Sequence, residues 1–123
     1  MILFWNAYRY LVLFERHVAR KDFASLYRAV SQHPCALRIP IADEVERVCA
    51  AVDKACAFYW KQVLCLQRSA ATACLLRNYG VRAELVIGTQ QLPFNSHAWV
   101  EVEGRVVNDR PYVRDVYAVL ARC

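Results

Sequence analysis

The segment QVLCLQRSAATACLL, residues 62–76, constrains the fold more than any other part of the chain. Apolar and small residues surround most of its helical wheel: Leu66, Ala70, Ala71, Ala73, Cys74, Leu75 and Leu76. A helix with this pattern is buried on most sides, and its alanines let other elements approach closely. We therefore predict a buried helix from Cys65 to Tyr79, ended by Gly80 in the left-handed conformation that suits the residue after a helix.

The rest of the chain predicts helices first and strands last. Apolar spacing indicates two amphipathic helices within residues 4–31, and Asp43 resembles the N-cap of a third helix that continues to Tyr59. Residues 81–87 are typical of a strand, QQLPFN is expected to be a loop, and a hairpin follows. The predicted fold class is α+β, in which the helical N-terminal half is followed by the buried helix and a small antiparallel sheet. We expect one domain, 1–123, divided into a helical region (1–59) and a core (60–123).

Composition points to a protein partner and away from nucleic acid. Hydrophobic residues make up 58% of the chain, which is more than so small a domain can easily hide, so we expect an exposed apolar patch. The formal net charge is +5. Because Lys and Arg are spread along the chain without a dense run, binding to nucleic acid is not expected.

The N-terminus MILFWNAYRYLVLF carries no targeting signal. It is interrupted by Asn6 and Arg9 and lacks both the basic start and the cleavage site of a signal peptide. No uninterrupted apolar run approaches the roughly 18 residues of a membrane helix. We therefore expect a cytoplasmic protein without a membrane contact. In that compartment the six cysteines should be reduced, and their spacing fits no zinc motif.

Cys65 is the candidate nucleophile, because it lies at the start of the buried helix. The helix dipole and the free backbone N–H groups at a helix start favour a thiolate, and the same N–H groups can stabilise an oxyanion. Cys74, nine residues later, faces the opposite side of the helix and cannot share the site. Taken alone, Cys65 also fits the description of an ordinary buried thiol.

The hairpin NSHAWVEVEGRVVND carries a histidine and an aspartate at its open end, where a hydrophobic core needs neither. A two-residue loop at 103–104 would turn Asp109 to the face opposite His97. A three-residue loop at 102–104, with Gly104 left-handed, would pair His97 directly with Asp109. We favour the three-residue loop, in which the carboxylate meets the imidazole Nδ1–H and Nε2 is left to face a thiol.

Each of these residues also has a structural explanation. A single histidine such as His97 is more often structural, and Asp109 could simply start a turn near the following proline. Asn108 could replace Asp109 as the residue that orients the histidine, as Asn does in papain-like enzymes. A cysteine at a helix start, a strand histidine and a paired aspartate together favour catalysis. The other two histidines, His17 and His33, have no such neighbours in the sequence.

The stretches CLQRSAATACLLRNYGVRAELVIG and HAWVEVEGRVVND resemble the leader peptidase of lasso-peptide biosynthesis, which belongs to the transglutaminase-like, papain-related cysteine proteases. The resemblance covers residues 60–110 strongly and residues 1–59 only in outline. It implies that residues 60–123 are a catalytic core, with Cys65 as nucleophile, His97 as general base and acid, and Asp109 as the orienting residue.

This resemblance implies hydrolysis of one peptide bond, which releases the leader from a ribosomally made precursor peptide without any metal or organic cofactor. The freed N-terminus would pass to an ATP-dependent lasso cyclase. A separate leader-binding protein is expected to present the precursor, and MILFW together with Tyr8, Tyr10 and Leu11 are the candidate docking residues.

Two other functions fit the same residues. One is a different acyl-transfer enzyme, such as a transglutaminase or an amidase, and the other is a non-catalytic peptide-binding module. Trp60 and Gln62 are candidates for a second oxyanion donor. Trp99, on the same strand face as His97, either shields His97 and Asp109 from water or belongs to the core.

Overall fold

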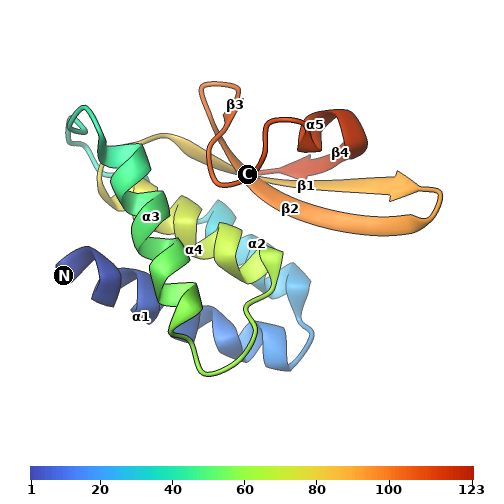
Figure 1. The fold of residues 1–123 in the computed structure, drawn as a ribbon, viewed down its shortest axis with the longest axis horizontal. Coiled ribbons are helices and arrows are strands. Elements are labelled where there is room, and N and C mark those ends of the chain that lie inside the picture. The colour runs from blue at the N-terminus through green and yellow to red at the C-terminus, as the bar shows by residue number, and fades with distance from the viewer.

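The computed structural model describes residues 1–123 and confirms the predicted α+β class. Its elements in chain order are α1 (Ile2–Ala19), α2 (Phe23–Ser31), α3 (Glu44–Ala57), α4 (Cys65–Asn78), β1 (Ala83–Gln91), β2 (Phe94–Val102), β3 (Arg105–Val106), α5 (Val113–Val116) and β4 (Ala118–Arg122). The four long helices form one layer and the sheet lies beside them, with α5 on the sheet's outer side (Figure 1). One large hydrophobic cluster joins residues on both sides of position 60, so the division into 1–59 and 60–123 stays a prediction.

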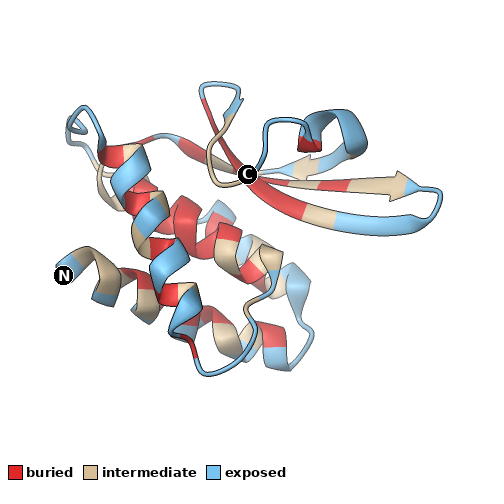
Figure 2. Cartoon of the chain, in the orientation of Figure 1, coloured by how far each residue is buried: buried red, intermediate tan, exposed pale blue.

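The buried helix predicted from the sequence is α4. It begins at Cys65, ends at Asn78 and buries ten of its 14 residues. The three N-terminal helices and strands β1 and β2 all pack against it, and Figure 2 shows the buried segments concentrated on α4 and on the inner part of the sheet. Gly80 has a φ of 87°, which confirms the left-handed position after the helix.

The N-terminal helices begin and end close to the predicted positions. Asp22 caps α2 by accepting a hydrogen bond from the Ser25 N–H at 3.2 Å. Asp43 is the N-cap residue of α3, as predicted, but its side chain makes no capping hydrogen bond. α3 also ends at Ala57 and does not continue to Tyr59. None of the helices is long and apolar enough to span a membrane.

The sheet has the order β3-β2-β1-β4 and is larger than the sequence predicted. β1 and β2 pair over their whole length, from Ala83 opposite Val102 to Gln91 opposite Phe94. The predicted loop QQLPFN is therefore mostly strand. This end of the hairpin extends beyond the helices and is exposed (Figures 1 and 2). Because neither of its faces is buried, its sequence has no apolar alternation from which the strand could be predicted. β4, which pairs with β1, was not predicted either, because most of its side chains are exposed.

The predicted register of the second hairpin is wrong. Val102 pairs with Arg105 and Glu101 with Val106, so the loop has two residues. Glu103 and Gly104 both have positive φ, 51° and 76°. This is the turn geometry that matches the twist of a two-residue hairpin. The positive φ of Glu103 was not predicted, because glutamate is not a residue type that favours this conformation. β3 then stops at Val106, so Asp109 lies in a loop and its position does not depend on strand register.

The two faces of the sheet have different partners. Leu85, Ala98 and Val100 belong to the large cluster that includes α4. On the opposite face Trp99 and Val86 form a small second cluster with Val113 of α5. Because side chains alternate along a strand, His97 lies on the same face as Trp99, beneath the C-terminal segment.

Arg77, near the end of α4, ties the layers together. Its buried guanidinium donates to the carbonyl oxygens of Val30, His33, Ala83 and Cys123, at 2.5, 3.1, 2.9 and 2.8 Å. These carbonyls come from α2, the following linker, β1 and the C-terminus. One cation thus joins four segments of the chain through charge-assisted hydrogen bonds.

Candidate active site

The first candidate residue, Cys65, is the first residue of α4. The preceding Leu64 is extended and offers no capping side chain, so the first N–H groups of α4 have no side-chain cap. The Cys65 thiol is partly buried and makes no hydrogen bond. Unpaired N–H groups at a helix start are able to stabilise both a thiolate and an oxyanion.

Four of the other five thiols are poor nucleophiles. Burial raises the pKa of Cys49 and of Cys56 to about 11 and the pKa of Cys74 to about 12. Burial also raises the pKa of Cys123. These thiols stay protonated near neutral pH and behave as small apolar side chains.

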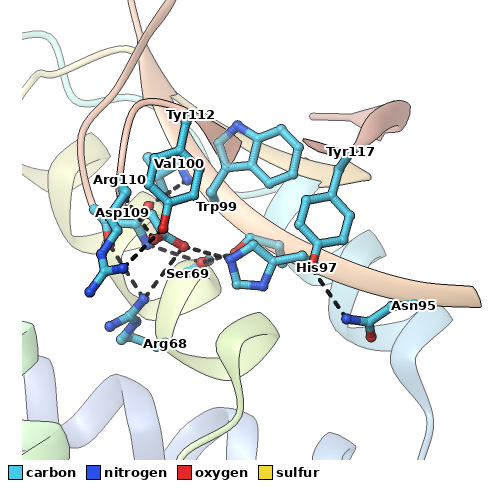
Figure 3. A network of polar contacts seen from close by, with 12 residues as sticks. Arg68, Ser69, Asn95, His97, Trp99, Val100, Asp109, Arg110, Tyr112 and Tyr117 are labelled. Atoms are coloured by element: carbon cyan, nitrogen blue, oxygen red, sulfur yellow. Dashed lines mark hydrogen bonds and ion pairs between the residues drawn. The ribbon is translucent and has the colours of Figure 1, made fainter. Parts of the chain in front are cut away.

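His97 and Asp109, the other two candidates, are in direct contact. The distance between His97 Nε2 and Asp109 Oδ2 is 2.5 Å (Figure 3). The sequence prediction of this pair holds although the register from which it was derived is wrong. The prediction also chose the wrong ring nitrogen: Asp109 meets Nε2, so it is Nδ1 that remains free to serve a nucleophile.

The surroundings of Asp109 favour its ionised form. Partial burial raises the pKa of this carboxyl, but the hydrogen bond from His97, the Arg110 backbone N–H at 2.7 Å and the charge of Arg68 at 4.0 Å together lower the pKa below its ordinary value. A carboxylate in this state can hold the imidazole by a charge-assisted hydrogen bond.

Asn108, the alternative orienting residue, points elsewhere. Its Oδ1 accepts the Val100 N–H at 2.8 Å, and its Nδ2 donates to Ser69 Oγ at 3.0 Å. Ser69 Oγ in turn donates to the carbonyl oxygen of Ala98 at 3.1 Å. Asn108 thus fastens the loop after β3 to β2 and α4, and the structure brings Asp109, not Asn108, to His97.

These contacts also tie the start of α4 to β2 and to the loop that holds Asp109. Ser69 lies one helical turn after Cys65 and on the same helix face, and its partner Ala98 is the residue next to His97. Arg68 lies between α3 and the loop, 3.8 Å from Asp53 and 4.0 Å from Asp109. The structure therefore joins His97 and Asp109 directly and ties the first turns of α4 to the loop that holds Asp109, while Cys65 makes no hydrogen bond to His97 or Asp109.

Gln67, a fully buried residue that was not predicted to have a role, fixes the first turn of α4 against α1. Its Nε2 donates to the Leu11 carbonyl oxygen at 2.8 Å and lies 3.2 Å from Glu15 Oε1. Glu15 also accepts hydrogen bonds from Tyr59 and Lys61, both at 2.9 Å. Burial raises the pKa of Tyr59 to about 12, and the hydrogen bond to Glu15 contributes to the same rise. This network holds the turn that carries Cys65.

The remaining candidates lie outside the site or in the core. Trp60 and Gln62 are exposed, and neither makes a hydrogen bond in the site. Trp99 is fully buried in the small second cluster, with its indole N–H bonded to Glu101 at 2.9 Å, so it is a core residue that also borders His97. His33 bonds to Asn78 at 2.8 Å and is structural.

The chain belongs to the transglutaminase-like superfamily. The family model described as "Transglutaminase-like superfamily" matches residues 9–122, nearly the whole chain. The chain is also 47% identical over 57 residues to the microcin J25-processing protein McjB of Escherichia coli. That match covers 46% of this chain and 27% of McjB, so the chain spans about a quarter of that relative's length. No solved structure matches significantly. These two matches confirm the resemblance that the motifs indicated.

Proposed function

We propose that this protein is a cysteine peptidase that removes the leader from a ribosomally made lasso-peptide precursor before the macrolactam ring is closed. The observation that supports the proposal is the hydrogen-bonded His97–Asp109 pair, whose loop is tied to α4, the helix that begins at Cys65. Similarity to a protein named for the processing of microcin J25 supports the choice of substrate.

In the proposed reaction the Cys65 thiolate attacks the carbonyl carbon of the scissile bond, while backbone N–H groups at the start of α4 stabilise the oxyanion. His97 Nδ1 takes up the thiol proton and then protonates the departing amine. Asp109 stabilises the imidazolium through Nε2. Water, deprotonated by the same imidazole, hydrolyses the acyl-enzyme and releases the leader. No metal or cofactor takes part.

The proposal includes a separate leader-binding protein. An apolar groove between α1 and α3 is the candidate docking surface and is lined by Met1, Leu3, Phe4, Trp5, Tyr8, Ala50, Ala51 and Phe58, with Arg47 and Lys54 at its edge. Two of the docking residues predicted from the sequence are excluded: Tyr10 and Leu11 are buried in the core. The lasso cyclase is the protein expected to receive the released core peptide in the cytoplasm.

The product distinguishes this function from its rivals. We expect that the enzyme, its partner and a lasso-peptide precursor yield two peptides whose masses sum to that of the precursor plus one water. Release of ammonia or a crosslinked product would instead identify an amidase or a transglutaminase. A precursor that is bound but unchanged would identify a binding module.

Thiol labelling tests the site without a substrate. At about pH 6, iodoacetamide should modify Cys65 well ahead of the four thiols whose pKa is raised by burial. Peptide mapping locates the modified residue, and Cys65→Ser should remove the fast phase. Equal, slow labelling of all six thiols would contradict an activated Cys65.

A further inference from the structure

Tyr117, the residue between α5 and β4, lies against the imidazole ring of His97. The two ring centroids are 5.3 Å apart and the ring planes differ by 29°, which is a stacked arrangement (Figure 3). The Tyr117 hydroxyl accepts a hydrogen bond from Asn95 Nδ2 at 3.2 Å, and its backbone N–H donates to the Val113 carbonyl oxygen at 3.0 Å. The tyrosine is thus held at both ends while its ring covers one side of the histidine.

Trp99 forms the second wall beside the same histidine. Its ring lies 6.1 Å from that of His97 and 6.2 Å from that of Tyr117. Trp99 is fully buried, and the hydrogen bond to Glu101 fixes its indole. Because this indole fills the space beside Tyr117, the tyrosine ring has little room to move away from the imidazole.

Gly88, directly opposite His97 on β1, makes this arrangement possible. A Cβ atom at Gly88 would lie 2.7 Å from the Trp99 ring and 2.8 Å from Tyr117 Cβ, closer than real contacts allow. The pairing of β1 with β4 also shifts register between Ile87 and Gly88, and such irregularities redirect side chains locally. Gly88 and the register shift thus leave room for the side chains of Trp99 and Tyr117 to pack over β1 beside His97.

Stacking against Tyr117 restricts the rotation of the His97 ring, which the hydrogen bond to Asp109 does not fix by itself. Rotation of a histidine ring about its Cβ–Cγ bond has a broad energy profile, and a single hydrogen bond to Asp109 allows the ring to tilt. We propose that Tyr117 is a positioning residue for His97: by stacking on the imidazole it fixes the ring plane, so that Nε2 stays on Asp109 and Nδ1 stays directed at the reacting atoms. The effect on rate rests on the proposed peptidase function, whereas the effect on the ring does not.

Proton NMR of the histidine tests the inference without any substrate. The wild-type chain labelled with ¹⁵N should show a downfield imidazole N–H resonance from the His97–Asp109 hydrogen bond, assigned by its loss in Asp109→Ala. Tyr117→Leu, which keeps apolar bulk but no ring, should broaden this resonance beyond detection, and Tyr117→Phe should keep it. Tyr27→Ala, a half-buried tyrosine of α2, is the control and should also keep it. If Tyr117→Leu does not fold, Gly88→Ala is the second variant. Its Cβ would press on Tyr117 Cβ and on the Trp99 ring, which disturbs the stack on His97, so the N–H resonance should broaden here too.

Kinetics then separate positioning from binding. Tyr117→Leu should lower kcat for precursor cleavage about 10- to 100-fold, because a catalytic group displaced by an ångström costs a rate of this size. The KM should change by less than about threefold. A sharp N–H resonance in folded Tyr117→Leu would overturn the inference, and so would a loss of activity that appears only in KM. If the wild-type chain cleaves no precursor, the proposed function fails, but the NMR comparison still decides the role of Tyr117.

Discussion

At the scale of single residues, the proposed chemistry depends on three side chains held by three different segments. Cys65 depends on the start of α4, His97 on β2 and Asp109 on a loop after β3. The loop is the least regular of the three, yet Asn108 bonds to both β2 and Ser69 and so fixes the residue next to Asp109. An irregular segment can therefore hold a catalytic carboxylate when its neighbouring side chain is fully bonded.

The first prediction concerns the relative weight of the three polar residues. His97→Ala should abolish leader cleavage in a folded protein, because it removes the proposed general base and acid. Asp109→Ala should lower kcat about 10²- to 10⁴-fold, since orientation is lost and the nucleophile is kept. Asn108→Ala should act mainly through stability, measured by thermal unfolding. A harmless Asp109→Ala together with an inactive, stable Asn108→Ala would contradict this assignment.

The second prediction concerns pH. The pKa of Asp109 is lowered in the folded chain, so its ionised form stabilises the fold above the unfolded pKa of about 3.9, and that stabilisation is lost as pH falls through the lower folded pKa. The free energy of unfolding of the wild type should therefore exceed that of Asp109→Asn near neutral pH, and the gap should close below about pH 4. Urea denaturation at several pH values measures the gap. A gap that is independent of pH would mean that the carboxylate charge does not stabilise this loop.

At the scale of elements, the sequence was informative where a side-chain pattern reports burial. α4 was predictable because residues from Gln67 to Arg77 are nearly all buried and mostly small or apolar. The outer half of the β1–β2 hairpin and β4 were not predictable, because exposed strands carry no apolar alternation. The site was predicted from residue types and motifs. Its supports, Tyr117 and Gln67, were missed because stacking and long-range hydrogen bonds leave no local signal.

The third prediction tests the two-residue turn. Gly104 has a φ of 76°, and a Cβ atom there would meet nothing within 4 Å, so any cost of substitution comes from backbone conformation alone. Gly104→Val should destabilise the fold by about 1–3 kcal/mol, whereas Gly104→Asn should cost clearly less, because Asn tolerates positive φ. Thermal or urea unfolding measures both. Equal, negligible effects would contradict the left-handed geometry of this turn.

At the scale of the whole molecule, the His97–Asp109 pair and the apolar groove are built on different elements. His97 of β2 meets Asp109 in the loop after β3, and the large exposed side chains Trp5 and Phe58 lie on the groove between α1 and α3. A peptidase that leaves leader recognition to a partner needs such a second surface, because the site itself needs to hold only the residues around the scissile bond.

The fourth prediction tests that surface. Trp5→Ala should raise the concentration of the leader-binding protein needed for half-maximal cleavage, about tenfold, as expected when an exposed aromatic anchor is removed. The rate at saturating partner should stay unchanged. Leu37→Ala removes a fully exposed apolar side chain outside the groove and is the control. Equal cleavage rates with and without the partner would contradict the two-protein arrangement.

The measurement that tests the central claim most directly compares cleavage of the precursor by the wild type, Cys65→Ala and Cys35→Ala, each in the presence of the leader-binding protein. Cys35 is a partly buried thiol outside the site, so it controls for the loss of a cysteine as such. We predict that Cys35→Ala cleaves at the wild-type rate and that Cys65→Ala, folded as judged by circular dichroism, releases no leader above the uncatalysed background. Leader release by Cys65→Ala at a rate close to that of the wild type would contradict the account.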